Sequence, residues 1–143
     1  MSAPLPWQAT CVAIGGRGVL IEGPAGSGKS SLALMLIDRS AQLIGDDGVL
    51  IEPHSASLIA RPHPNTRGLL ELRNLGVLPW PVTDEAPVAL VILLDAAAPR
   101  FIDAPETCER AGIALPLVRL WPDSPALALR AEAALRQYGL SRP

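Results

Sequence analysis

The sequence has one lysine, two cysteines and five aromatic residues, and it contains no apolar run of membrane-spanning length. Its twelve basic and fourteen acidic residues give a formal net charge of −2, and the basic residues form no block. Nucleic-acid binding through phosphate neutralisation needs a concentrated positive surface, so we expect no nucleic-acid partner. A transmembrane helix needs about 18 or more consecutive apolar residues, so we expect no membrane association of that kind.

The two cysteines and the N-terminal stretch give information on the cellular location of the protein. Residues 1–11, MSAPLPWQATC, have no basic segment followed by a long apolar one, and so do not resemble a secretory signal. Cys11 and Cys108 are too few for a disulfide framework or a metal site. We expect both to be small core residues, and two unlinked thiols predict a reducing, cytoplasmic location.

The composition predicts a globular chain, because 49% of the 143 residues are hydrophobic and 18% are charged. This length suits a single domain, predicted over 1–143. The first half predicts a hairpin with strands over 9–14 and 19–23 around the glycine-rich turn GGRG. A helix over 29–39, with apolar residues at helical spacing, and a short strand over 41–47 are predicted to follow. An α/β fold is therefore expected.

The second half continues this mixture. A second hairpin is predicted over 48–53 and 56–61, followed by a turn-rich loop over 61–68. The segment 69–80 fits a strand, a short helix or both. The remaining elements are a strand buried on both faces at 88–96, another strand at 112–120, and a helix over 125–139 that starts at a proline and ends at a glycine.

The segment GPAGSGKSS, 23–31, matches the phosphate-binding pattern G-x-x-x-x-G-K-[ST] at every fixed position. It follows an apolar strand and precedes a helix, which is the context that this motif needs. The glycines let backbone N–H groups surround an anion, and the helix N-terminus adds its positive dipole end. We expect Lys29 to reach the β- and γ-phosphates and Ser30 to ligate Mg²⁺. The predicted nucleotide-binding residues are Gly23, Ala25, Gly26, Ser27, Gly28, Lys29, Ser30 and Ser31.

A phosphate loop needs acidic partners before it can catalyse a reaction. Asp46 and Asp47 end a predicted strand, where α/β sheets place their ligands, although Asp-Asp-Gly is also good turn chemistry. Glu71 and Arg73 would share one face of an extended segment, where they could pair with each other or address a phosphate–metal centre. Asp95 ends the apolar run VILLDA and competes with Asp47 as a metal ligand.

Two segments together, GVLIEGPAGSGKSSLALMLIDRSAQLIGDDGVLIE and GLLELRNLGVL, resemble the catalytic domain of bacterial HPr kinase/phosphorylase. That family places Asp-Asp 17 and 18 residues after the loop lysine, and Asp46 lies 17 residues after Lys29 here. It also carries L-x-E-x-R-G-x-G, which LLELRNLG follows except at Asn74. The resemblance covers about residues 8–80 well and the remainder weakly.

The resemblance implies a phosphate-loop kinase fold that uses ATP and Mg²⁺ to phosphorylate a serine of the phosphocarrier protein HPr. It implies that Asp46 is the acid/base group, that Ser30, Asp47 and Glu71 surround the metal, and that Arg73, with Lys29, stabilises the transferring phosphoryl group. Many family members also catalyse the reverse phosphorolysis and assemble as hexamers. A homo-oligomer is therefore a possible state of this chain.

Three positions depart from the family pattern. Gln8 stands where a histidine is usual, Ser31 replaces a common acidic residue, and Asn74 replaces a glycine. The N-terminal domain and C-terminal active-site loop of full-length members have no recognisable counterpart, so we expect kinase activity more than phosphorolysis. Two alternatives stay open. One is a small-molecule kinase, although no compact arginine cluster suggests its lid; the other is a nucleotide-binding regulator without turnover. A GTPase is disfavoured because no N-K-x-D motif occurs.

Overall fold

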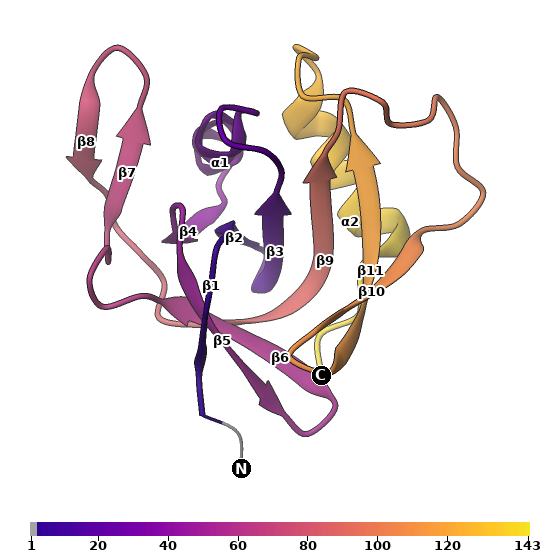
Figure 1. Cartoon of the computed structure of the whole chain (residues 1–143), viewed down its shortest axis with the longest axis horizontal. Coiled ribbons are helices and arrows are strands. Elements are labelled where there is room, and N and C mark those ends of the chain that lie inside the picture. Colours follow the sequence, from indigo (N-terminus) through magenta and orange to yellow (C-terminus); the bar gives the residue numbers. More distant parts are fainter. Residues whose placement is uncertain (1–2) are drawn as a thin grey trace.

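Strand β9 (Ala86–Leu94) lies at the centre of the fold, which a computed structural model describes for residues 3–143. Its neighbours in the core sheet are β3 (Arg17–Glu22), β2 (Thr10–Ile14) and β4 (Gln42–Gly45) on one side, and β11 (Ile113–Leu120) and β10 (Glu106–Arg110) on the other. Both β3 and β11 run parallel to β9. Strand β2 is antiparallel to β3, β4 is antiparallel to β2, and β10 is antiparallel to β11, so β4 runs in the same direction as β3. The three parallel strands β3, β9 and β11 therefore end at one edge of the sheet (Figure 1).

A second layer crosses below the core sheet. It contains β1 (Leu5–Trp7), β5 (Val49–His54) and β6 (Ser57–Pro62), which pair antiparallel in that order. Strand β6 also pairs with the first residues of β9, so β9 belongs to both layers. Within residues 3–143, these strands and those of the core sheet form one nine-stranded sheet.

Alternating side chains of the central strands divide the apolar interior in two. Val19 and Ile21 of β3 face a cluster that includes both helices, α1 (Lys29–Asp38) and α2 (Leu127–Tyr138). Leu20, between them, faces the cluster formed with the second layer. This alternation follows from the two-residue period of a strand, and because β9 is flanked on both faces, nearly all of its side chains are buried.

A separate hairpin, β7 (Leu69–Leu72) and β8 (Gly76–Pro79), projects from the body beside α1 (Figure 1). Leu70 is the one buried residue of its two strands. The sequence left this segment open between strand and helix, and it forms two strands joined by a turn over 73–75, where Asn74 has a φ of 73°. An isolated hairpin has little stability of its own, so its position depends on contacts with the body.

The predicted elements are confirmed with small shifts of their ends. The first hairpin turns at Gly15 and Gly16, which both have positive φ as a two-residue hairpin turn requires. The helices and the buried strand β9 also occur where the apolar patterns indicated. Strands β1 and β10 were not predicted, because LPW is short and proline-rich and ETCER is polar. Neither helix in the described part of the chain is long and apolar enough to span a bilayer.

Candidate phosphate-binding site

The glycine-rich segment forms the connection between β3 and α1. Gly26 and Gly28 have φ values of 77° and 101°, a region that favours glycine, and a turn closes between the Ser27 N–H and the Pro24 carbonyl oxygen at 3.1 Å. Helix α1 starts at Lys29 without a side-chain cap. The unpaired N–H groups of its first turn are therefore free to bind an anion.

The first glycine of the loop lies against the end of β9. A Cβ atom on Gly23 would lie 2.7 Å from Ser27 Oγ and 3.2 Å from the Leu94 carbonyl oxygen, so no larger residue fits there without a shift. Lys29 Nζ donates hydrogen bonds to the carbonyl oxygens of Gly23, at 2.9 Å, and Pro24, at 3.2 Å. The lysine side chain thus folds back over the loop.

Asp46 lies directly after β4 and is only 7% exposed. Its Oδ1 accepts hydrogen bonds from Ser30 Oγ at 2.6 Å and from Thr10 Oγ1 at 3.0 Å, and its Oδ2 accepts one from the Glu71 N–H at 3.0 Å. One carboxylate therefore connects the phosphate loop, the start of β2 and the hairpin β7–β8.

Asp47 is exposed, unlike its neighbour, and its backbone has a φ of 58°. Aspartate tolerates this left-handed conformation better than most residues. The Asp47 N–H donates to Thr10 Oγ1 at 3.3 Å, so one threonine contacts both adjacent aspartates. The left-handed turn directs the two carboxylates to different surroundings, one buried and one open.

Glu71 and Arg73 come from the hairpin and line the same cavity as the phosphate loop. Arg73 Nη2 lies 3.9 Å from the position that a Cβ atom on Gly26 would take, so its guanidinium group reaches over the loop. The ion pairs found in residues 3–143 include neither side chain. Glu71 belongs to β7 and Arg73 to the turn that follows it, and both charges remain available to a ligand.

The resulting phosphate cavity has a volume of about 190 Å³. Its walls are Thr10, Ala25, Gly26, Gly28, Lys29, Ser30, Ser31, Asp47, Glu71 and Arg73. Cationic and anionic groups share it, which suits a polyphosphate together with a divalent cation. No cluster of three or more His, Cys, Asp or Glu side chains able to hold a metal occurs in the described residues. Mg²⁺ at phosphate sites needs only one or two carboxylates, so Ser30 with its acidic neighbours fits that ion.

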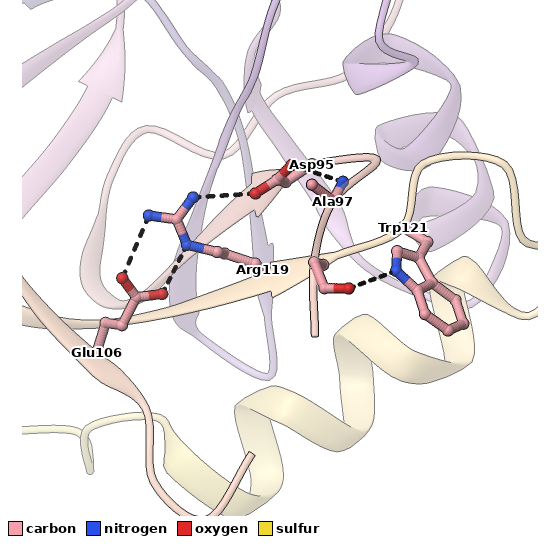
Figure 2. A network of polar contacts seen from close by, with 6 residues as sticks. Asp95, Ala97, Glu106, Arg119 and Trp121 are labelled. Carbon is pink, nitrogen blue, oxygen red and sulfur yellow. Dashed lines mark hydrogen bonds and ion pairs between the residues drawn. The ribbon is translucent and has the colours of Figure 1, made fainter. Parts of the chain in front are cut away.

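Four predicted residues do not line this cavity, and one of them, Asp46, is connected to it through its hydrogen bonds to Ser30 and the Glu71 N–H. Gly23 and Ser27 belong to the loop but do not line the cavity. Asp95 follows the end of β9 and lines a different cavity, on the other side of the loop. Asp95 Oδ2 accepts a hydrogen bond from Arg119 at 3.0 Å, and its Oδ1 accepts one from the Ala97 N–H at 2.8 Å (Figure 2). These contacts lower the Asp95 pKa, chiefly through the Ala97 N–H, and they separate this carboxylate from the expected metal site.

Sequence reasoning missed Thr10 and an ion pair next to the loop. Thr10 is fully buried, and the only signal for it was a hydroxyl residue inside an apolar strand. Glu22, the residue before Gly23, accepts hydrogen bonds from Arg110 at 2.7 and 3.0 Å and from the Trp7 indole N–H at 2.9 Å. No spacing in the sequence relates these residues, because Arg110 lies 88 positions after Glu22.

The fold and this loop define a phosphate-loop nucleotide-binding protein of the α/β class. The model for the HPr serine kinase C-terminal domain matches residues 2–94, and the chain belongs to that family. A solved structure, the HPr(Ser) kinase/phosphatase from Coxiella burnetii, superimposes with a TM-score of 0.81 at 28% identity, covering 93% of this chain and 95% of that one. The family and fold expected from the sequence are thereby confirmed.

Curated relatives agree with this assignment. The HPr kinase/phosphorylase of Mycoplasma mycoides subsp. mycoides is 38% identical over 94 residues, which are 61% of this chain and 30% of that protein. The HPr kinase/phosphorylase of Clostridium beijerinckii is 45% identical over 67 residues, 47% of this chain and 22% of that protein. The aligned part of this chain thus spans less than a third of the length of either relative.

Proposed function

We propose that the chain is an ATP- and Mg²⁺-dependent serine kinase that phosphorylates an HPr-type phosphocarrier protein. The relatives are named for this activity. The observation that carries the proposal here is the meeting of the phosphate loop, Asp47, Glu71 and Arg73 around one cavity, with Asp46 hydrogen-bonded to two of the residues that line it. Phosphoryl transfer depends mainly on positioning and charge stabilisation, which such a set of residues provides.

The two aspartates have separate roles in this proposal, exchanged relative to the sequence-based expectation. Asp46 is buried and already accepts three hydrogen bonds, one of them from Ser30. It orients the Ser30 hydroxyl and adds negative charge on the metal side of the cavity. Asp47 is exposed and carries no such contacts, so its carboxylate is able to accept the proton of an incoming serine hydroxyl.

The other charged groups complete the site. Ser30, with Asp46 beside it and Glu71 across the cavity, is the proposed holder of Mg²⁺, which supplies neutralisation of the phosphate charge when bound. Lys29 and the N-terminal N–H groups of α1 bind the phosphates. Arg73, over the loop at Gly26, stabilises the negative charge that spreads over the transferring group.

A second cavity, of about 470 Å³, offers an approach for the acceptor. Asp47 lines both it and the phosphate cavity, so it stands between the two. The walls of the second cavity include Trp7 and Gln8 from the first strand region, and His63, Asn65 and Thr66 from the following loop. We place the serine-bearing segment of the phosphocarrier there, because it brings the hydroxyl to Asp47.

Self-association and a cytoplasmic location are part of the proposal. The hairpin β7–β8 exposes Leu75, Val77 and Leu78, with 72%, 59% and 37% of their surfaces accessible. Apolar side chains grouped on one projecting element favour an interface, and a second copy of the chain is the simplest partner. Two free cysteines suit a reducing compartment.

The test is phosphorylation of HPr from the same organism by the purified chain with ATP and Mg²⁺, followed by mass spectrometry of the phosphorylated residue. An HPr variant whose acceptor serine is replaced by alanine is the matched control. Phosphoserine on native HPr alone is the expected result. ATP binding without transfer would instead favour the nucleotide-binding regulator, and transfer to a small metabolite would favour the small-molecule kinase.

A further inference from the structure

The phosphate cavity is too small for a whole nucleotide. Its volume of about 190 Å³ lies below the ~300–1,000 Å³ of typical small-molecule pockets. Most of the groups that line it are polar or charged, which suits phosphates and a cation better than the flat apolar face of a base. A nucleoside attached to those phosphates must therefore extend into a neighbouring space.

One neighbouring cavity lies on the opposite side of the phosphate loop. It has a volume of about 530 Å³, and Pro24 and Ser27 of the loop form one of its walls. Its remaining lining consists of Leu93, Leu94, Asp95, Ala96, Ala97, Arg119 and Pro122. Most of these side chains are apolar, as expected for a pocket that receives the flat face of a base. We call this space the strand-end cavity.

The cavity beside Asp47 is the alternative, and the position of Asp47 argues against it. That residue separates the phosphate cavity from the space lined by Trp7 and Thr66. A nucleoside placed there would occupy the side on which an acceptor has to approach the terminal phosphate. The strand-end cavity leaves that approach open.

The topology of the sheet supports the same choice. The strand-end cavity lies beyond the last residues of β9 and β11, which run parallel to the loop-bearing strand β3. Open α/β sheets bind their ligands outside the carboxyl ends of parallel strands. The acidic groups Asp46 and Asp47 follow β4, on the other side of β3. The two sides of the loop are thus chemically different.

The rim of the cavity is held in place by ion pairs (Figure 2). Arg119 connects Asp95, at the end of β9, with Glu106 of β10, through contacts of 3.0 Å and 2.7 Å. The Trp121 indole N–H also donates to the Ala98 carbonyl oxygen at 2.7 Å, which ties the segment after β11 to the segment after β9. A preformed rim lowers the ordering cost of binding.

One polar atom on the loop side of the cavity lacks a partner. Ser27 Oγ is buried, and it makes no hydrogen bond with any described residue. Buried hydroxyl groups without a partner are uncommon in native proteins and call for an explanation. Its Oγ is closed off from the cavity in this structure, so a shift of the loop on nucleotide binding would be needed to bring an acceptor oxygen to it.

We infer that the strand-end cavity is the nucleoside subsite, which takes the base and ribose of the nucleotide whose phosphates lie on the loop. The inference rests on the proposed nucleotide dependence of this chain. It adds the location of the part of the ligand that no motif in the sequence addresses. Affinity for ATP above that for inorganic tripolyphosphate then comes from this cavity.

The variant Ala97→Trp tests this by filling the cavity with a large side chain. Ala97 is exposed and contributes a backbone N–H, not its side chain, to the contact with Asp95. Ala104→Trp is the matched control, because Ala104 is an exposed alanine of the same connection between β9 and β10 and lines none of the three cavities discussed. Calorimetry would measure the binding of Mg-ATP and of Mg-tripolyphosphate to each variant.

We expect Ala97→Trp to weaken ATP binding about tenfold or more and to change tripolyphosphate binding less than about twofold. Ala104→Trp should change neither. Unchanged ATP affinity in Ala97→Trp would overturn the inference. If that variant weakened both ligands equally, photo-crosslinking of the unaltered chain with 8-azido-ATP would decide, because adducts within 93–97 or 119–122 support the inference and adducts confined to other segments refute it.

These outcomes are separable from those of the kinase assay. A chain that binds ATP in the strand-end cavity but does not phosphorylate HPr would refute the proposed function and leave the nucleoside subsite in place. A chain that phosphorylates HPr while Ala97→Trp binds ATP normally would support the proposed function and refute the nucleoside subsite.

Discussion

Asp46 and Asp47, replaced one at a time, should differ in effect: the first change should lower the stability of the chain, and the second should lower the rate of phosphoryl transfer. Asp46→Ala removes an acceptor for three donors, Thr10 Oγ1, Ser30 Oγ and the Glu71 N–H. Hydrogen bonds to a charged group contribute about 1.5 kcal/mol or more each, so about 4–5 kcal/mol is at stake. Relief of repulsion from nearby carboxylates offsets about 1–2 kcal/mol of this. We expect a net loss near 3 kcal/mol, and a fall in melting temperature of about 10 °C.

The matched change is Asp47→Asn, which keeps the size of an exposed side chain and tolerates a positive φ. Its stability should stay within about 0.5 kcal/mol of the native chain. Transfer to HPr should nevertheless fall about 100-fold or more, because a catalytic base contributes at least that factor. Asp46→Asn retains part of the hydrogen bonding. Its free energy of unfolding should lie between those of Asp46→Ala and Asp47→Asn, about 1 kcal/mol below that of the native chain.

Urea unfolding followed by tryptophan fluorescence measures the stabilities, and phosphoserine formation on HPr at a temperature where every variant is folded measures the transfer. If Asp47→Asn transferred phosphate normally while Asp46→Asn did not, the assignment of the base to Asp47 would be wrong. If the urea midpoint of unfolding of Asp46→Ala equalled that of the native chain, the hydrogen bonds to Asp46 would contribute none of the stability attributed to them.

Three further predictions follow from the loop and the core. Arg73→Gln should lower the rate of transfer about 100-fold and alter ATP affinity far less, because the guanidinium group acts on developing charge; single-turnover kinetics compared with calorimetry checks this. Gly23→Ala should displace the loop, since its Cβ would lie 2.7 Å from Ser27 Oγ, and lower affinity for ATP and tripolyphosphate alike; equal affinities in the variant and the native chain would contradict the close fit. Burial raises the pKa of the Cys11 thiol from 9.0 to about 12, so iodoacetamide at pH 8.5 should leave Cys11 unlabelled in the native chain and label it in urea. Because the unfolded thiol ionises first, stability should fall as the pH rises through about 9, and Cys11→Ala should lessen that fall.

Local patterns predicted most of the framework. The apolar runs around the glycine turn gave the first hairpin, and helical spacing of Leu32, Ala33 and Leu36 gave α1, because burial on one face imposes those periods. The family resemblance also brought together the loop, the aspartates and the hairpin acid. These features depend on short stretches of sequence, so a single chain is enough to recognise them.

The remaining features depend on pairings between distant segments. Strand β10 exists because β11 offers it an edge, and nothing in ETCER itself indicates a strand. The different burial of Asp46 and Asp47 arises from a left-handed backbone at the second residue and from Thr10, which approaches from β2. Spacing along the sequence cannot distinguish two neighbouring acids whose environments are set by a third strand.

The hairpin β7–β8 has a consequence for the timing of a reaction cycle. It carries Glu71 and Arg73, yet Leu70 is the sole buried residue of its two strands, and a backbone hydrogen bond to Asp46 attaches it to the site. Segments with few buried contacts open at a much lower free energy than the sheet that carries them. The acid and the arginine can therefore leave the phosphate loop and return many times during the lifetime of one folded molecule. In the proposed kinase cycle, admission of a nucleotide and release of a product would then require only the opening of an eleven-residue arm, 69–79.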